Sequence, residues 1–419
     1  MKRLLSVLSQ QILHSPDSST AVEIRKMGLE TLHQILESSG FGLVGWDMVF
    51  DMLGSVCGTP SFLRPERSSS GDTVAASVPS AVQSPSSSPL TRPKPLSLGI
   101  GAPPAATERN SGNLIKIAFG SLTLICDSYI SHLSPPDLKL CIRTLGLFGK
   151  TPDTNIALTA AASLLWSVSD SIQTKRKTKE GEEAFHDIWM FLLLESLGLT
   201  TDNRSEVRDG AIQTIFRTMM LYGPTLGEEM WEECIWGVVF PLLDTLTSIQ
   251  QGDEEVAASK WDESKTLALQ SLGSLYHDFL AMKVIHLTRF EESWERFVGV
   301  IEGCCIDDVT VAIPALRCLE KAVRVSLNAK DTKHTRVVSV GERTWGAIEK
   351  IGDVIVARKG SGPFSQESLV AFLNVVQSTR AMQFALFGTE WELVRLRKLL
   401  EILKGAVRNY SVRLQANMV

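Results

Sequence analysis

Apolar residues recur at helical spacing on both sides of a turn in residues 205–244. The stripe before the turn consists of Val207, Ile212, Ile215 and Met219. The stripe after the Gly223-Pro224 turn consists of Trp231, Ile235, Val238, Val239, Leu242, Leu243 and Leu246. Residues three and four positions apart share one face of a helix, so this pattern predicts a helical hairpin. Neither helix can bury such a face alone, and the hairpin therefore needs neighbours.

The same pattern recurs along the chain. Glu23-Ile24-Arg25 aligns with Glu206-Val207-Arg208, and a small residue, Gly28 or Ala211, follows in each segment. The template of aliphatic, small and aliphatic residues fits segments 24–32, 156–164, 207–215, 267–275 and 311–319. A tryptophan recurs in the partner helix, at Trp46, Trp231, Trp294 and Trp345. A two-helix unit that repeats at intervals of roughly 40 to 60 residues is typical of solenoids. We therefore predict an all-α, HEAT/armadillo-like α-solenoid of stacked helical hairpins, with a compact helical bundle as the alternative.

The amino-acid composition of the chain changes between residues 59 and 110. Ser, Pro, Ala and Gly dominate there, and such a segment cannot bury enough apolar surface to offset its chain entropy. The predicted organisation is N-terminal helical repeats at 1–58, a disordered Ser/Pro-rich insertion at 59–110 and an α-solenoid of HEAT-like repeats at 111–419. Pro241 and Pro314 fall inside predicted helices, and we expect both to interrupt and bend them.

Composition limits the possible functions. The chain has 419 residues and a net charge of -5, which gives no reason to expect a nucleic-acid partner. Its continuous apolar runs are far too short to cross a bilayer. The seven cysteines show no paired CxxC spacing, and most lie in apolar stripes. We expect free thiols that pack as small hydrophobic side chains, in a protein with a reducing, cytosolic location.

No catalytic motif is present in the sequence. The seven histidines form neither HExxH nor a Cys/His cluster with metal-ligand spacing, and there is no phosphate-binding GxxxxGK[ST] loop or GxSxG elbow. Cys304-Cys305 has no adjoining basic residue that would activate a thiol. We therefore expect no enzyme activity, no cofactor, no metal and no small-molecule substrate.

One candidate interaction surface is a group of charges at a helix entrance, made of Asp202, Arg204, Glu206 and Arg208. Residues two positions apart do not face each other on a helix, so these charges cannot all pair with one another. Two interpretations are open. The charges bind neighbouring repeats to each other, or they form a partner-binding edge.

A second candidate surface is the last predicted helix, 391–412. Basic residues surround its apolar stripe at Arg395, Arg397, Lys398, Lys404 and Arg408. A basic amphipathic helix can lie on an anionic membrane, which makes these residues candidates for membrane contact. A terminal helix of a solenoid would show a similar pattern.

Residues 201–244 also carry an ordered set of motif residues. These are Asp202, Arg204, Glu206-Val207-Arg208, Ile215-Phe216, Gly223, Trp231 and Phe240-Pro241-Leu242. In this order they resemble the Mon-two family, large Golgi and endosome scaffolds related to the big Arf guanine-nucleotide exchange factors. The resemblance covers residues 114–325. Because family members are much longer than this chain, we expect a C-terminal portion, with a split gene product or an incomplete gene model as the alternatives.

The resemblance implies a role in vesicle-mediated transport. The family acts between the trans-Golgi network and endosomes, at their cytoplasmic face, as peripheral membrane or cytosolic proteins. Its partners are Dopey-type proteins, Arf-like small GTPases and an aminophospholipid flippase. The FRLPGE-like loop of its exchange-factor relatives is absent from this sequence, which favours a non-catalytic scaffold. The alternatives are a guanine-nucleotide exchange regulator of Arf-type GTPases and a solenoid adaptor of the nuclear-transport or phosphatase-scaffold kind.

Overall fold

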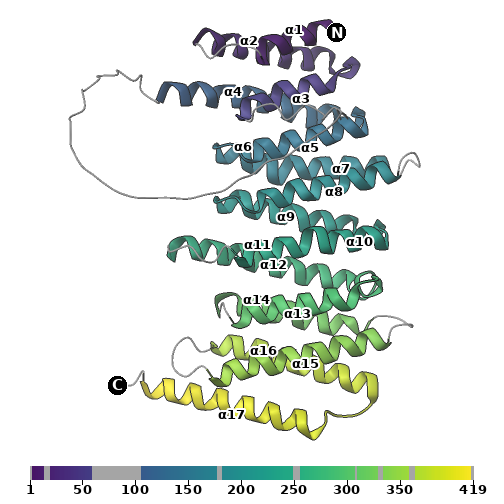
Figure 1. The fold of residues 1–419 in the computed structure, drawn as a ribbon, viewed down its shortest axis with the longest axis vertical. Coiled ribbons are helices and arrows are strands. Elements are labelled where there is room, and N and C mark those ends of the chain that lie inside the picture. Colours follow the sequence, from purple (N-terminus) through teal and green to yellow (C-terminus); the bar gives the residue numbers. More distant parts are fainter. Residues whose placement is uncertain are drawn as a thin grey trace, which may run out of the picture.

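The computed structural model describes residues 2–13, 19–58, 105–176, 182–248, 255–306, 309–328, 334–357 and 364–416. All regular structure within these ranges is helical. Successive helices alternate between two layers (Figure 1). The first layer contains α1 (Lys2–Leu13), α3 (Trp46–Gly54), α5 (Pro135–Gly149), α8 (Glu182–Leu199), α10 (Glu228–Cys234) with α11 (Phe240–Ser248), α13 (Phe290–Ile306), α15 (His334–Ala357) and α17 (Leu393–Ala416). The second layer contains α2 (Ser19–Ser39), α4 (Ala105–Leu124), α6 (Thr154–Leu158) with α7 (Leu165–Arg176), α9 (Ser205–Tyr222), α12 (Glu255–Phe279), α14 (Ala312–Ser326) and α16 (Gln366–Phe387).

Each layer is a stack in which a helix packs on the next member of the same layer. In the second layer, α9 packs on α12, α12 on α14 and α14 on α16. In the first layer, α11 packs on α13, α13 on α15 and α15 on α17. The stack runs from the N-terminus at one end to α17 at the other (Figure 1). The predicted all-α solenoid of stacked hairpins is confirmed.

The repeated tryptophans all lie in the first layer. Trp46, Trp231, Trp294 and Trp345 belong to α3, α10, α13 and α15, and all four are buried. The indole Nε1 of Trp231 donates a hydrogen bond to the carbonyl of Gly223 at 3.0 Å. This bond ties the second helix of the 205–244 hairpin to its own turn.

The repeated small residues lie where second-layer helices pack closely. Ala160, Ala211 and Ala315 are fully buried. In α12 a close approach falls at Gly273, where an added Cβ would lie 3.3 Å from the Cα of Cys318 in α14. The template's Ser271 is only half-buried, and Ile24 in α2 is exposed. Among the described residues no second-layer helix lies beyond α2 to cover Ile24.

The two internal prolines behave differently. Pro241 is the second residue of α11, just after a π-helical turn, Ile235–Val239, which joins α10 to α11. A proline ring clashes with the carbonyl four residues earlier, here that of Gly237, and so interrupts the α-helical hydrogen bonds at this point. Pro314 was expected to bend its helix, but α14 begins at Ala312. In the first turn a backbone N–H has no helical acceptor, so Pro314 interrupts nothing.

Helix boundaries differ from the sequence-based expectation at three places. Helix α4 begins at Ala105, and the preceding part of the predicted insertion, 59–104, lies outside the described residues. The apolar periodicity predicts helices over residues 262–280 and 341–356, but α12 and α15 begin about two turns earlier, at Glu255 and His334. One helical stretch of 22 residues, Ser111–His132, is long and apolar enough to cross a membrane. Half of its apolar window is buried in the stack, where α4 packs against α2, so we interpret it as a core helix.

Candidate interaction surfaces

Arg204 joins the loop before α9 to the end of α5. Its Nη1 donates to the carbonyl of Thr151 at 2.7 Å, and its Nη2 donates to the carbonyl of Gly149 at 3.4 Å. Its Nε and Nη2 also donate to the two carboxylate oxygens of Asp202, at 2.9 and 2.7 Å. A planar guanidinium can hold a bidentate carboxylate while binding carbonyls beyond it, which a lysine cannot do. Asp202 therefore orients Arg204 toward the preceding repeat.

Arg208 joins α9 to α12 in the opposite direction along the stack. Its side chain is completely buried. Its Nε donates to Ser264 Oγ at 2.7 Å, its Nη2 to the carbonyl of Lys260 at 3.0 Å, and its Nη1 to the carbonyl of Asp202 at 2.8 Å. The guanidinium carbon also lies 3.8 Å from the centre of the Trp261 ring. This buried cation is satisfied by acceptors and a π face from two repeats.

We call Asp202, Arg204, Arg208 and Ser264 the 202–264 seam. Ser264 Oγ donates onward to Asp209 Oδ1 at 2.5 Å, so a carboxylate also balances the buried charge. Glu206, the fourth member of the predicted cluster, is exposed and accepts a hydrogen bond from Ser205 at 3.4 Å. The structure thus brings Asp202, Arg204 and Arg208 together between repeats and leaves Glu206 at the surface.

The charges in the seam shift the pKa of Asp202. Burial alone would raise this pKa, but hydrogen bonds from Arg204 and the nearby charges of Arg204 and Arg208 hold it below its usual range. The carboxylate form is therefore the one that the folded repeats stabilise.

Side chains that bind carbonyls of the preceding repeat recur further along the stack. Lys283 Nζ donates to the carbonyl of Leu226 at 3.1 Å, and Arg336 Nη1 donates to the carbonyls of Ile285 and Leu287 at 2.5 and 2.9 Å. In α17, Asn409 Nδ2 donates to the carbonyl of Ile355 at 2.9 Å. These acceptors lie at helix ends and in turns, where carbonyls lack helical partners. These residues carry no signal in the sequence, because nothing in it shows which carbonyl each one reaches.

Surface ion pairs also connect consecutive first-layer helices. Arg296 of α13 pairs with Asp244 of α11, and Arg343 of α15 pairs with Glu295 of α13 at 2.9 Å. Lys350 of α15 pairs with Glu302 of α13 at 2.8 Å. In these three pairs the base comes from the later helix, whereas Lys139 of α5 pairs with Asp187 of the later helix α8 at 3.6 Å. Each exposed pair contributes at most about 1 kcal/mol, so their main effect is to define register between repeats.

The five basic residues predicted in the last helix divide into two groups. Arg395 pairs with Glu342 at 2.5 Å, and Lys398 pairs with Asp353 at 2.6 Å, so both point toward α15. Arg397, Lys404 and Arg408 are exposed and form no ion pair with the described residues. Two of the five candidates therefore hold α17 to the stack, and three lie on its outer face.

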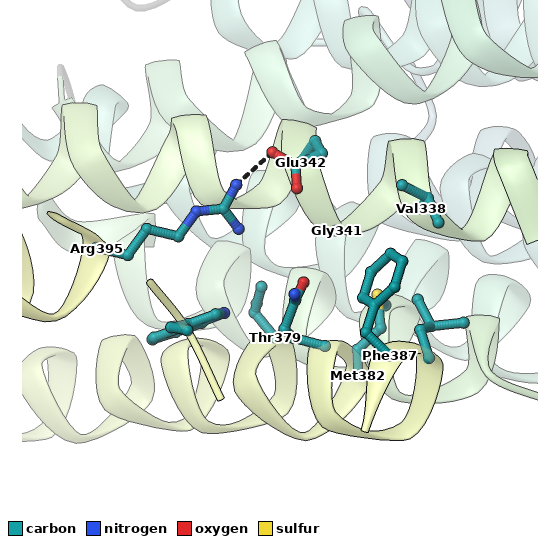
Figure 2. A pocket seen from close by; sticks show the side chains of 10 residues that line it. Val338, Gly341, Glu342, Thr379, Met382, Phe387 and Arg395 are labelled. Atoms are coloured by element: carbon teal, nitrogen blue, oxygen red, sulfur yellow. Dashed lines mark hydrogen bonds and ion pairs between the residues drawn. The ribbon is translucent and has the colours of Figure 1, made fainter. Parts of the chain in front are cut away.

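The pair Arg395–Glu342 borders a small pocket between α15, α16 and α17, which Figure 2 shows with the dashed contact at its edge. Thr379 and Met382 line its floor. Its volume is about 10 Å³, which is about the space that one water molecule needs. It has no room for a substrate or cofactor.

A wider pocket lies where α12 and α14 end, and it was not predicted. Its volume is about 580 Å³, and it is open to solvent. His277, Asp278, Lys321 and Arg324 contribute charges of both signs to its walls. Arg324 also pairs with Glu320 at 3.3 Å. Such a wide, open depression with charged side chains in its walls resembles a protein-contact surface more than the enclosed pockets that bind small molecules.

The cysteines are placed as packing residues. Cys57 is half-buried and the other six are buried, all as free thiols. Burial raises the pKa of the Cys57 and Cys234 thiols to about 12, and it also raises the pKa of Cys305. The thiolate is the reactive form, so these three thiols are poor nucleophiles. Within the described residues, no group of three or more His, Cys, Asp and Glu side chains could hold a metal ion.

Comparison with known proteins bears on the part of the stack that contains the seam. Residues 178–356, from the segment before α8 to the end of α15, match the family described as the C-terminal region of Mon2 protein. The resemblance to the Mon-two family is confirmed. A Mon2 homologue of Drosophila melanogaster is 28% identical over 255 residues, which cover 52% of this chain and 15% of the fly protein. The Mon2 homologue of Homo sapiens is 24% identical over 283 residues, which cover 57% of this chain and 16% of the human protein.

The similarity extends weakly to an exchange factor. The ADP-ribosylation factor guanine nucleotide-exchange factor SEC7 of Saccharomyces cerevisiae is 22% identical over 159 residues, which cover 37% of this chain and 8% of SEC7. Among solved structures, a circular tandem repeat protein with novel repeat topology and enhanced subunit contact surfaces aligns over 99% of each chain. Its TM-score of 0.36 and 12% identity are too low to support an argument. The matched part of the chain spans only 15 to 16% of the fly and human Mon2 relatives, which are much longer.

Proposed function

We propose that the chain is a non-catalytic scaffold in vesicle-mediated protein transport between the trans-Golgi network and endosomes. The observation that carries this proposal is the match of residues 178–356 to the C-terminal region of Mon2, on a continuous stack of helical hairpins. Golgi and endosome membranes are the proposed location, and the chain acts at their cytoplasmic face.

The proposed mechanism is surface presentation. Each repeat of a solenoid contacts mainly its neighbours, so the stack exposes an extended surface to several partners at once. The 202–264 seam and the first-layer ion pairs fix the orientation of successive repeats. Binding sites on different hairpins are thereby held at defined distances. Glu206 is the member of the predicted charge cluster best placed to contact a partner, because its side chain is exposed. Asp202 and Arg204 are half-buried, and Arg208 is completely buried.

The proposed partners are proteins. By family resemblance they are Dopey-type proteins, Arf-like small GTPases and an aminophospholipid flippase. The similarity to an ADP-ribosylation factor exchange factor supports the GTPase in particular. The open pocket between α12 and α14 is a candidate contact for one of them, since charges of both signs line it.

A second candidate function is guanine-nucleotide exchange on Arf-type GTPases, which the similarity to SEC7 favours. Purified chain would be mixed with Arf and Arf-like GTPases loaded with a fluorescent nucleotide. The scaffold proposal predicts that nucleotide release stays at its spontaneous rate. Acceleration that depends on chain concentration would support the exchange function instead.

Co-purification from cells tests the scaffold proposal directly. The chain, tagged at its C-terminus, would be isolated after mild crosslinking, and its partners identified by mass spectrometry. The proposal predicts Golgi and endosome trafficking proteins, with recovery reduced by charge reversal in the α12–α14 pocket. Recovery of nuclear-transport or phosphatase subunits from Golgi-depleted cytosol would contradict it and favour a soluble adaptor.

A further inference from the structure

The outer face of α17 carries two parallel stripes of different chemistry. Leu393, Leu396, Leu400 and Val407 form the exposed apolar stripe, while Val394, which is also exposed, lies beyond the basic residues. The exposed basic residues are Arg397, Lys404 and Arg408. At 100° per residue, the apolar set covers one sector of the helix and the basic set the adjoining sector. Within the described residues, no helix covers either stripe. Arg395 and Lys398 lie on the opposite side and hold this orientation through Glu342 and Asp353.

This face differs from the corresponding faces of the preceding first-layer helices. In α13 and α15, a glutamate precedes the arginine that pairs backward, as Glu295-Arg296 and Glu342-Arg343. Each glutamate accepts the arginine of the following helix, Arg343 and Arg395 respectively. In α17 the corresponding residue is Val394, which is exposed. At this position α17 therefore lacks the acid that would receive the arginine of another such helix, although Glu401, seven residues later, is exposed on the same side.

The charge on this face favours an anionic occupant. Three basic side chains are exposed there, and Glu401 is the exposed acid beside them. A second copy of the chain applied through the same face would bring like charges together, which costs free energy. A bilayer with anionic lipid can accept the aliphatic side chains at its headgroup boundary and the basic ones among its phosphates.

We propose that the outer face of α17 docks on the surface of an anionic lipid bilayer, with Arg397, Lys404 and Arg408 at the headgroups and Leu393, Leu396, Leu400 and Val407 at the acyl boundary. This inference deepens the proposed function, because it gives the scaffold a defined orientation on a membrane. The stack would then project from the bilayer, with its other repeats open to protein partners (Figure 1).

Vesicle co-sedimentation tests the inference. The full chain would be mixed with vesicles of phosphatidylcholine alone or of phosphatidylcholine with phosphatidylserine. Binding to the anionic vesicles alone is expected, weakening as salt is raised, because salt screens exposed charges. The triple variant Arg397→Gln, Lys404→Gln, Arg408→Gln is expected to bind about 100-fold more weakly, since each charge contributes about fivefold. The double variant Leu393→Gln, Leu400→Gln is expected to bind more weakly with its charges intact.

A charge-matched control removes exposed basic residues elsewhere, as Lys116→Gln, Lys139→Gln, Arg317→Gln on α4, α5 and α14. It is expected to bind anionic vesicles like the parent chain. Equal loss in both triple variants, or equal binding to both kinds of vesicle, would overturn the inference. So would a dimer in light scattering that Leu400→Gln converts to monomer while vesicle binding is absent, since the occupant would then be a second copy. Folding is checked by circular dichroism for every variant. Failure here beside successful recovery of trafficking partners would leave the scaffold proposal standing.

Discussion

The guanidinium of Arg208 lies 3.8 Å from the centre of the Trp261 ring, with both residues in the interface between α9 and α12. This contact places a fully buried cation between two repeats that are more than 50 residues apart in sequence, beside a hydrogen bond to Ser264 (separation 56). The stack is therefore fixed at this point by polar contacts as well as by aliphatic packing. The function proposed for it needs this kind of rigidity, because presented sites must keep their spacing.

Arg208→Lys is expected to destabilise the α9–α12 interface by about 2 to 4 kcal/mol. The ammonium group of a lysine cannot replace the hydrogen bonds that the three guanidinium nitrogens donate, nor the stacking of the guanidinium on Trp261. Repeat arrays need not unfold in one step, so amide hydrogen exchange of α9 and α12 is the appropriate measurement. Glu206→Gln, at the exposed neighbouring position, is expected to stay within about 0.5 kcal/mol of the parent. Equal protection in both variants would show that the seam contributes nothing.

Asp202→Asn is expected to destabilise the chain at neutral pH and to lose this effect in acid. The folded-state pKa of Asp202 is lowered, so its stabilisation is present above the unfolded pKa of about 3.9 and is lost as pH falls through the folded pKa. Thermal unfolding of the parent and variant across this range measures the difference. A difference that stays constant into strong acid would exclude an ionised Asp202 as the source.

Asp51→Asn in α3 is expected to stabilise the chain at neutral pH, whereas Asp202→Asn destabilises it. Burial, reinforced by the charge of Asp47 and opposed by that of Arg143, raises the pKa of Asp51 to about 6. The folded chain therefore loses stability as pH rises from about 4 to this value, and the uncharged amide avoids that loss. The variant should melt higher than the parent at neutral pH and equal it in mild acid. Asp47→Asn should give part of the same rise in melting temperature, because the charge of Asp47 helps to raise the pKa of Asp51. If Asp51→Asn melted lower than the parent at neutral pH, the raised pKa of Asp51 would be refuted.

Gly273→Leu is expected to destabilise the α12–α14 contact by about 1 to 3 kcal/mol through overpacking. An added Cβ would already lie 3.3 Å from the backbone of Cys318, which cannot rotate away. Gly299→Leu in α13 is the matched control, since nothing lies within 4 Å of a Cβ added there. Leucine forms helix better than glycine, so the control should be neutral or stabilising. Similar losses at both glycines, measured by thermal unfolding, would mean that close helix packing at Gly273 is not the cause.

The fold could be predicted because the buried apolar residues recur at helical spacing on one face of each helix. The stripe of Val207, Ile212 and Ile215 and the recurrent tryptophans depend on which face of each helix is covered, and adjacent hairpins cover it in the same way each time. Ile24 departs from the pattern because a side chain is buried only where another helix covers it, and among the described residues no second-layer helix lies beyond α2. Pro314 departs because α14 begins only two residues earlier, and local sequence defines helix starts poorly.

The interaction surfaces could be predicted only in part. The sequence places Arg204 and Arg208 at one helix entrance, but it does not show that one reaches back to Thr151 and the other forward to Ser264. Arg395 and Arg397 are two positions apart and chemically identical, yet one pairs with Glu342 and the other is exposed. Tertiary packing alone decides between them. The pocket between α12 and α14 combines residues from two helices and has no signal in either one.

The central claim is that this stack of hairpins works on Golgi and endosome membranes, as its match to the C-terminal region of Mon2 supports. Quantitative imaging of the fluorescently tagged chain, together with trans-Golgi and endosome markers, tests it most directly. We expect that the chain is enriched on these membranes and that the Arg397, Lys404 and Arg408 triple variant is displaced into the cytosol. A chain that is uniformly cytosolic or nuclear, with no enrichment on either compartment, would contradict the account.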